Sequence, residues 1–217
     1  MPAEDVPGVF ITVEGGDGAG KTTLARALTE CLRRSGRAVR LTFEPGGTAL
    51  GTHLRSLVLD PGVAMSDWDE TWLFLAARAS HVHEVLIPAL EAGEIVLSDR
   101  YSDSTLAYQG YGRGLDLERL TALNREATQG LSPDLTLMLD IPAELGLART
   151  RARSSQADRI GDADLAFHQR VNAGFRRLAA ERPERVHMID GRQDAAVVLG
   201  EALDVVNRWL DGRRARS

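Results

Sequence analysis

The chain has 217 residues, of which 43% are hydrophobic and 26% charged, an ordinary composition that predicts one globular domain over residues 1–217. Its formal net charge of −5 argues against general binding to nucleic acid. No apolar run approaches the roughly 20 residues of a membrane span, and the opening residues are acidic rather than signal-like, so we expect no membrane partner and a cytoplasmic location.

Five short apolar runs predict β-strands, at residues 9–14, 38–43, 95–99, 135–140 and 186–190. Helical patterns lie between and after them, at residues 23–34, 68–90, 115–128, 143–153, 163–182 and 194–210. The strands are almost continuously apolar, which is typical of strands covered on both faces. We therefore predict an α/β fold with a five-stranded parallel sheet flanked by helices on both faces.

The turn after the first predicted strand fits the pattern G-x-x-x-x-G-K-[ST] of a phosphate-binding loop. Its residues are Gly15, Gly16, Asp17, Gly18, Ala19, Gly20, Lys21 and Thr22. Of the 26 basic residues in the chain, 25 are arginines and the single lysine is Lys21, where a compact ammonium on a flexible stem is needed. The glycines allow successive backbone N–H groups to face a phosphate. We predict that this loop binds ATP, with Lys21 on the outer phosphates and the Thr22 hydroxyl on Mg²⁺.

Polar residues also follow the second and third predicted strands. Glu44 opens the segment Glu-Pro-Gly-Gly-Thr at 44–48, and Asp99 and Arg100 close the third strand. In open parallel sheets the ligand lies at this carboxyl edge. We predict that Asp99 holds Mg²⁺, directly or through water, and that the Arg100 guanidinium binds a phosphate monoester. The alternative is that the two residues form an ion pair that closes the strand.

Four arginines lie within residues 149–160, where the sequence turns polar after a predicted helix: Arg149, Arg151, Arg153 and Arg159. We predict an arginine-rich lid that neutralises the charge of a phosphoryl group in transfer and excludes water. The alternative is a solvated helix end, because cations favour helix C-termini.

Phe74 and Arg78 lie four residues apart on the predicted helix 68–90, so they share a face. An aromatic ring beside a guanidinium suits the stacking and hydrogen bonding of a nucleobase. The alternative is that Phe74 is an ordinary core residue.

These motifs together resemble the thymidylate kinases, a family of nucleoside-monophosphate kinases of the P-loop type. The resemblance runs essentially from end to end and rests on the segments 13–23 (VEGGDGAGKTT), 44–48 (EPGGT), 54–57 (LRSL), 74–78 (FLAAR), 99–101 (DRY), 107–110 (AYQG) and 158–160 (DRI). It implies transfer of the ATP γ-phosphoryl group to dTMP, giving dTDP and ADP for dTTP synthesis, with Mg²⁺. It also implies a homodimer that packs long helices together, with helix 68–90 as a contributor.

The resemblance further implies individual roles. The residues implied at the acceptor are Arg55 and Arg100 on its phosphate, Phe74 and Arg78 on its base, Thr105 and Gln109 near the base, and Tyr108 under the sugar. Asp17 and Glu44 are implied near the phosphates or the sugar 3′-hydroxyl. Because the loop carries no arginine at its variable positions, the lid is expected to supply the charge-stabilising arginine, as Arg149 or Arg153.

One position departs from the family pattern. Phe43 stands where the family usually has arginine, and we expect it to extend the core at the end of its strand.

Two alternatives to this function differ in class. The nearer is another P-loop kinase that acts on a different nucleotide or on a deoxynucleoside. The other is a nucleotide-hydrolysing switch, which would carry a base-reading motif such as Asn-Lys-x-Asp. That motif needs a second lysine, and the chain has none.

Overall fold

The computed structural model describes residues 7–153, 159–161 and 163–214 of the chain. Within them, five parallel strands form one sheet with the order β2-β3-β1-β4-β5. The strands are β1 (Val9–Gly15), β2 (Val39–Phe43), β3 (Ile95–Asp99), β4 (Leu135–Asp140) and β5 (Val186–Asp190). Residues of β1 are buried throughout, so the central strand is covered on both faces, as its apolar sequence predicts.

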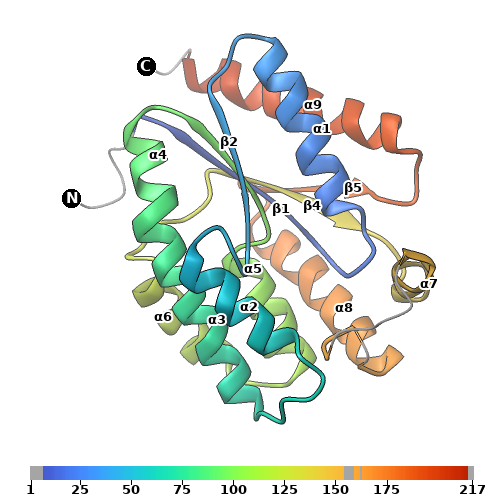
Figure 1. Cartoon of the computed structure of the whole chain (residues 1–217). Helices are drawn as coiled ribbons and strands as arrows, with labels where there is room; N and C mark the ends of the chain where they lie inside the picture. The colour runs from blue at the N-terminus through green and yellow to red at the C-terminus, as the bar shows by residue number, and fades with distance from the viewer. Residues whose placement is uncertain (1–6, 154–158, 162, 215–217) are drawn as a thin grey trace.

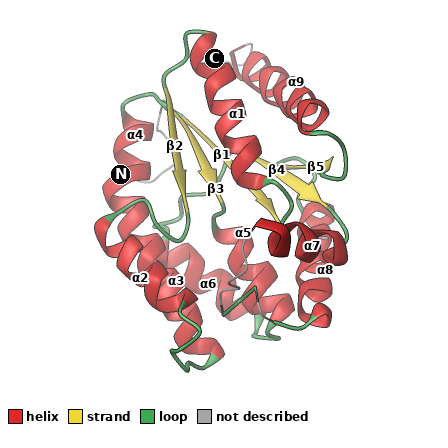
Figure 2. Ribbon diagram, turned by 45° about the vertical axis from the view of Figure 1, so that its right-hand side comes forward, coloured by secondary structure: helices red, strands yellow, loops and turns green. Residues whose placement is uncertain are grey.

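Helices cover both faces of this sheet (Figures 1 and 2). On one face, α1 (Lys21–Arg34) and α9 (Ala195–Arg214) pack on a core that includes Ile11 and Val13 of β1. On the other face lie α4 (Ile87–Glu91), α5 (Ser102–Thr105), the π-helix η3 (Leu106–Gly112) and α8 (Leu165–Glu181). The remaining helices are α2 (Ala49–Leu59), α3 (Asp67–His81), the π-helix η2 (Val82–Leu86), α6 (Leu117–Ala127) and α7 (Ala143–Arg153).

The predicted α/β fold, its five strands and its six helical regions are confirmed. The region 68–90 is less regular than its sequence pattern, because η2 interrupts it between α3 and α4. The N–H of Ile87 bonds to the carbonyl of Val82, five residues back. Pro88 follows directly, and since proline has no N–H and its ring crowds the carbonyl four residues earlier, the wider turn relieves that conflict.

Two helical regions do not follow from the sequence pattern. The helix α2 buries only Gly51 and Val58, and its Leu50 and Leu57 are exposed, so its leucines do not form one stripe toward the core. The α5–η3 region is buried nearly all round and contains two glycines, which removes the periodic signal of a surface helix.

The topology brings three separate segments to one edge. The neighbours β2, β3 and β1 are parallel, so their carboxyl ends, and the loops that follow at 15–20, 44–48 and 100–101, lie side by side. In the described part of the chain, no helix is both long and apolar enough to cross a membrane.

Candidate active site

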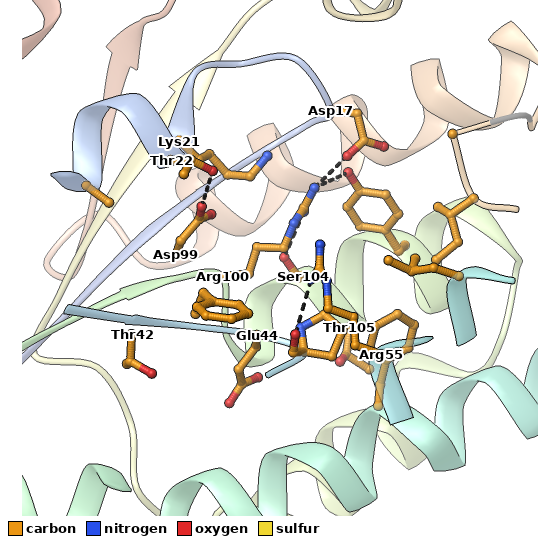
Figure 3. A pocket seen from close by; sticks show the side chains of 18 of the residues that line it. Asp17, Lys21, Thr22, Thr42, Glu44, Arg55, Asp99, Arg100, Ser104 and Thr105 are labelled. Carbon is orange, nitrogen blue, oxygen red and sulfur yellow. Dashed lines mark hydrogen bonds and ion pairs between the residues drawn. The ribbon is translucent and has the colours of Figure 1, made fainter. Parts of the chain in front are cut away.

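A cavity of about 640 Å³ opens at the carboxyl edge of β1, β2 and β3. Figure 3 shows the loop residues Lys21 and Thr22 with Asp99 at one end, Glu44, Arg55 and Thr105 at the other, and Arg100 between them. The predicted site residues that line this cavity are Asp17, Gly18, Gly20, Lys21, Thr22, Glu44, Arg55, Phe74, Arg78, Asp99, Arg100, Thr105, Tyr108 and Gln109. Gly15, Gly16 and Ala19 complete the backbone of the loop without lining the cavity.

The loop after β1 has the conformation that phosphate binding needs. Gly15, Gly18 and Gly20 have φ of 138°, 71° and 97°, in the region that favours glycine. Gly18 also lies against α7, since a Cβ at this position would come within 2.1 Å of the Gly146 carbonyl oxygen. Gly20 caps α1, so the N-terminus of that helix points its free N–H groups at the cavity.

Lys21 lies folded against its own loop. Its Nζ donates hydrogen bonds to the carbonyl oxygens of Gly15, at 3.0 Å, and Gly16, at 2.7 Å. Burial and the nearby Arg100 guanidinium lower the pKa of the Lys21 ammonium to about 8. The Asp17, Asp99 and Glu14 carboxylates offset this only in part. An incoming phosphate would add negative charge beside the ammonium and would return its pKa toward the ordinary value.

The oxygen ligands predicted for Mg²⁺ are in contact with each other. The Thr22 hydroxyl donates to Asp99 Oδ2 at 2.5 Å, which joins the start of α1 to the end of β3. The described residues contain no group of three or more His, Cys, Asp or Glu that could cage a metal. A hydroxyl and one carboxylate fit Mg²⁺, which is usually bound through one or two protein oxygens, substrate phosphates and water.

Arg100 reaches across the middle of the cavity. Its backbone φ is +75°, unusual outside glycine. The Nη2 atom donates to Asp17 Oδ1 at 2.5 Å and to the Tyr108 hydroxyl at 3.0 Å, and the guanidinium lies 4.9 Å from the centre of that ring. Burial opposes ionisation of Asp17, but Arg100 and Lys21 outweigh it and hold the pKa of this carboxyl below its usual value. The alternative interpretation, an Asp99–Arg100 ion pair, is not among the contacts: Arg100 pairs with Asp17, and Asp99 accepts a hydrogen bond from Thr22.

Two residues that the sequence analysis did not single out, Glu14 and Ser104, support Arg100. Glu14, fully buried in β1, accepts hydrogen bonds from the Tyr101 N–H at 2.7 Å and from the Ser104 hydroxyl at 2.6 Å. Ser104 Oγ in turn accepts from Arg100 Nη1 at 3.2 Å. Burial, reinforced by the Asp103 carboxylate, raises the pKa of Glu14 to about 7. The available signal was an acid inside an otherwise apolar strand.

The far end of the cavity is built on a buried ion pair. Arg78 of α3 is only 2% exposed and donates through Nε to Glu44 Oε2 at 2.8 Å. The same carboxylate lies 2.9 Å from His81 Nδ1. Burial alone would raise the pKa of Glu44, but Arg78 and His81 more than offset it, so this pKa lies below its usual value.

Arg78 also organises its surroundings. Its Nη1 donates to Thr105 Oγ1 at 2.8 Å and to Asn124 Oδ1 at 2.5 Å, and its Nη2 donates to the Tyr101 carbonyl at 3.1 Å. Four of its five N–H groups therefore have protein partners, which leaves one for a ligand.

Phe74 and Phe43 are not fully buried core residues, because both line the cavity. Phe74 is half-buried, packs against the core cluster of η3 and α8, and lines the cavity. The expectation that Phe43 extends the core is wrong, because its side chain is 45% exposed and lines the cavity. Its ring lies 5.8 Å from the Arg55 guanidinium, and Arg55 Nη1 donates to the Pro45 carbonyl at 3.1 Å.

The arginines of the predicted lid do not share one environment. Arg149 Nη1 donates to the Gly191 carbonyl at 2.8 Å, beside the phosphate-binding loop. Arg159 turns to a buried carboxylate, Glu70. Arg153 ends α7 and its side chain lies outside the described residues, as do residues 154–158, so the lid itself stays a prediction.

A phosphate-binding loop on the central strand, an acid on its neighbour and a guanidinium across the cavity define this chain as a P-loop phosphotransferase. The family described as "Thymidylate kinase" matches residues 13–201. The chain therefore belongs to the thymidylate kinase family.

Individual relatives agree with this assignment. The chain is 52% identical to a thymidylate kinase of Synechococcus sp. (strain JA-2-3B'a(2-13)), over 93% of this chain and 96% of the relative. It is 54% identical to a thymidylate kinase of Deinococcus radiodurans, over 84% and 88%. The crystal structure of thymidylate kinase from Ehrlichia chaffeensis superimposes with a TM-score of 0.74 at 33% identity, over 92% of this chain and 98% of the other.

Proposed function

We propose that this cavity transfers the γ-phosphoryl group of ATP to dTMP, giving ADP and dTDP. An oxygen of the acceptor phosphate attacks the γ-phosphorus, and the bond from that phosphorus to the β,γ-bridging oxygen breaks. The acceptor phosphate is largely ionised at neutral pH, so the reaction needs positioning and charge neutralisation rather than a strong general base. The observation that carries this proposal is one continuous cavity with an anion-binding loop at one end and Arg55, Arg78 and Arg100 along the rest.

On this proposal, the loop amides and Lys21 hold the ATP phosphates, and Thr22 and Asp99 hold Mg²⁺, which would neutralise charge on the donor phosphates. Arg100, anchored by Asp17, Ser104 and Tyr108, reaches the acceptor phosphate together with Arg55. The charge-stabilising arginine comes from the lid, as Arg149 or Arg153.

The remaining roles concern the nucleoside. Phe74 stacks on the thymine, while Thr105, Gln109 and the remaining N–H of Arg78 bond its edge. Tyr108 lies under the sugar, and Glu44 holds Arg78 in place through their ion pair.

The test is the replacement Lys21→Ala, with Lys21→Arg as the matched variant that keeps the charge but not the compact ammonium. We expect Lys21→Ala to lower kcat at least 100-fold in an assay coupled to ADP formation, with unchanged circular dichroism. Near-parental turnover of Lys21→Ala would overturn the phosphate role. Offering dTMP, dUMP, dCMP and thymidine as acceptors then decides the substrate, and a preference for any acceptor other than dTMP would favour a different P-loop kinase.

We also propose a homodimer formed through α2 and α3. The exposed side chains of Leu50, Leu57 and Trp72 lie on these two adjacent helices, which pack against each other. Large apolar side chains gathered on one face of a protein are typical of an interface. A cytoplasmic location stays a prediction from the sequence.

A further inference from the structure

Glu70 of α3 is a buried carboxylate outside the cavity that accepts hydrogen bonds from three residues at once. Its Oε1 accepts from Gln109 Nε2 at 2.7 Å, and its Oε2 accepts from Arg113 Nη2 at 3.0 Å and from Arg159 Nη2 at 2.5 Å. The side chain is 1% exposed, so these partners replace the water that a carboxylate normally binds. Neither Glu70 nor Arg159 lines the cavity, and neither has a place in the proposed reaction.

The bond from Gln109 fixes the orientation of an amide that does line the cavity. A carboxylate only accepts hydrogen bonds, so the amide nitrogen must face Glu70 and the carbonyl oxygen must face away from it. Without this bond the amide could rotate and exchange a donor for an acceptor at the same place. Glu70 therefore determines which hydrogen-bonding group Gln109 offers.

The bond from Arg159 fixes a second part of the cavity wall. Arg159 Nε donates to the Val58 carbonyl at 3.1 Å, and the Arg159 backbone N–H donates to the Leu59 carbonyl at 3.2 Å. The two residues that follow, Ile160 and Gly161, line the cavity. Arg159 thus ties this wall to the end of α2 and, through Glu70, to Gln109.

We propose that Glu70 is a positioning residue for the acceptor base, which it acts on through Gln109, and that Arg159 takes part by fixing the Glu70 carboxylate. The inference rests on the proposed function, because it assigns the base to the Gln109 end of the cavity. It gives Arg159 a structural task distinct from the phosphate contact predicted for lid arginines.

The test is a double-mutant cycle between Arg159→Gln and Gln109→Ala, read as the ratio of kcat/KM for dTMP to kcat/KM for dCMP. We expect Arg159→Gln to reduce this ratio by about 3- to 10-fold, although Arg159 does not line the cavity. In the Gln109→Ala background the same change should have no further effect on the ratio, because the amide it would disturb is gone. Arg177→Gln is the matched control, since Arg177 is exposed on α8 and pairs only locally with Glu181.

Two results would overturn the proposal. One is an unchanged ratio in Arg159→Gln, even with lower stability or uniformly lower activity, since a merely structural role predicts that pattern. The other is a loss of selectivity that is equally large with and without Gln109. If Arg159→Gln does not fold, Arg159→Lys replaces it, since it keeps the charge and loses the fork between Glu70 and Val58. The activity of the parental chain on dTMP tests the proposed function by itself. A failure of the proposed function is therefore distinguishable from a failure of this inference.

Discussion

Glu14 shows how a single residue links the sheet to the reacting end of the cavity. It lies in the central strand, yet its carboxylate faces Ser104 and the backbone of Tyr101, directly beside the residue that spans the cavity, Arg100. A buried acid in this position contributes a pH dependence to stability, because its proton is held more tightly in the folded chain than in the unfolded one.

The sign of this effect follows from the two pKa values of Glu14. The folded value of about 7 lies above the ordinary value of 4.5. The contribution of Glu14 to the free energy of unfolding is therefore fully present below pH 4.5 and is lost as the pH rises through 7. The loss is on the order of 3 kcal/mol. We expect the free energy of unfolding of the parental chain to fall relative to that of Glu14→Gln between pH 5 and 8.

Urea unfolding at four pH values across this range measures the difference. The exposed Glu184→Gln serves as the control and should run parallel to the parental chain. Parallel curves for Glu14→Gln as well would show that Glu14 ionises normally in the folded state.

At the scale of elements, α7 and the phosphate-binding loop approach each other backbone to backbone. A Cβ at Gly146 of α7 would come within 2.2 Å of the Asp17 carbonyl oxygen, while Gly18 makes the reciprocal approach to α7. The loop therefore keeps its shape only because a glycine stands on each side of the contact.

We expect Gly146→Ala to lower the free energy of unfolding by about 1–3 kcal/mol and to raise the KM for ATP, because backbone must move apart to admit the methyl group. Gly200→Ala is the matched control: Gly200 is an exposed helical glycine in α9 with open space around it. There the same change should stabilise the chain by up to about 1 kcal/mol. Chemical denaturation measures the free energy of unfolding, and ATP titration of the activity measures the KM. Equal values of both quantities in Gly146→Ala and Gly200→Ala would contradict the close contact.

Some helices and strands of this fold can be predicted from the sequence, and others cannot. The strands, the loop 15–22 and the regular helices depend on short-range patterns, so their sequences indicate them. The π-helical turn η2 arises from the position of Pro88 within a longer helix. The helix α2 buries only two of its residues, so its sequence has no apolar stripe that would indicate a helix. Neither leaves a periodic signal.

Site residues divide in a similar way. Lys21, Thr22, Asp99 and Arg100 belong to recognisable motifs and lie around one cavity. Glu70 could not be found in this way, because a carboxylate in the first turn of a helix resembles an ordinary capping residue. Its meaning comes from Gln109 and Arg159, which are 39 and 89 residues away in the chain.

At the scale of the whole molecule, the adjacent helices α2 and α3 carry large apolar side chains that are exposed. Leu50 is 50% exposed and Trp72 is 47% exposed, with Leu57 nearby on the same helix as Leu50. Both helices also contribute cavity residues, Arg55 from α2 and Phe74 and Arg78 from α3. A second chain seated on this face would therefore support the acceptor end from outside.

We expect Trp72→Glu to prevent formation of the proposed dimer, because a carboxylate buried at the interface without a partner opposes association. Sedimentation velocity at micromolar concentration measures the change. Val197→Glu is the control, since Val197 is equally exposed but lies on α9, on the opposite side of the sheet. A monomeric parental chain, or dimers that survive Trp72→Glu, would contradict the proposed interface.

Arg78 constrains how the specificity of this enzyme can evolve. Its guanidinium faces the cavity and also neutralises the buried Glu44, so replacing it would leave that carboxylate with only His81 beside it. Breaking such a pair costs about 3–5 kcal/mol, a large share of the 5–15 kcal/mol that keeps a typical protein folded. A lineage that acquires a new acceptor would sooner change the half-buried Phe74, where a new side chain can be tolerated, and inherit Arg78 unchanged.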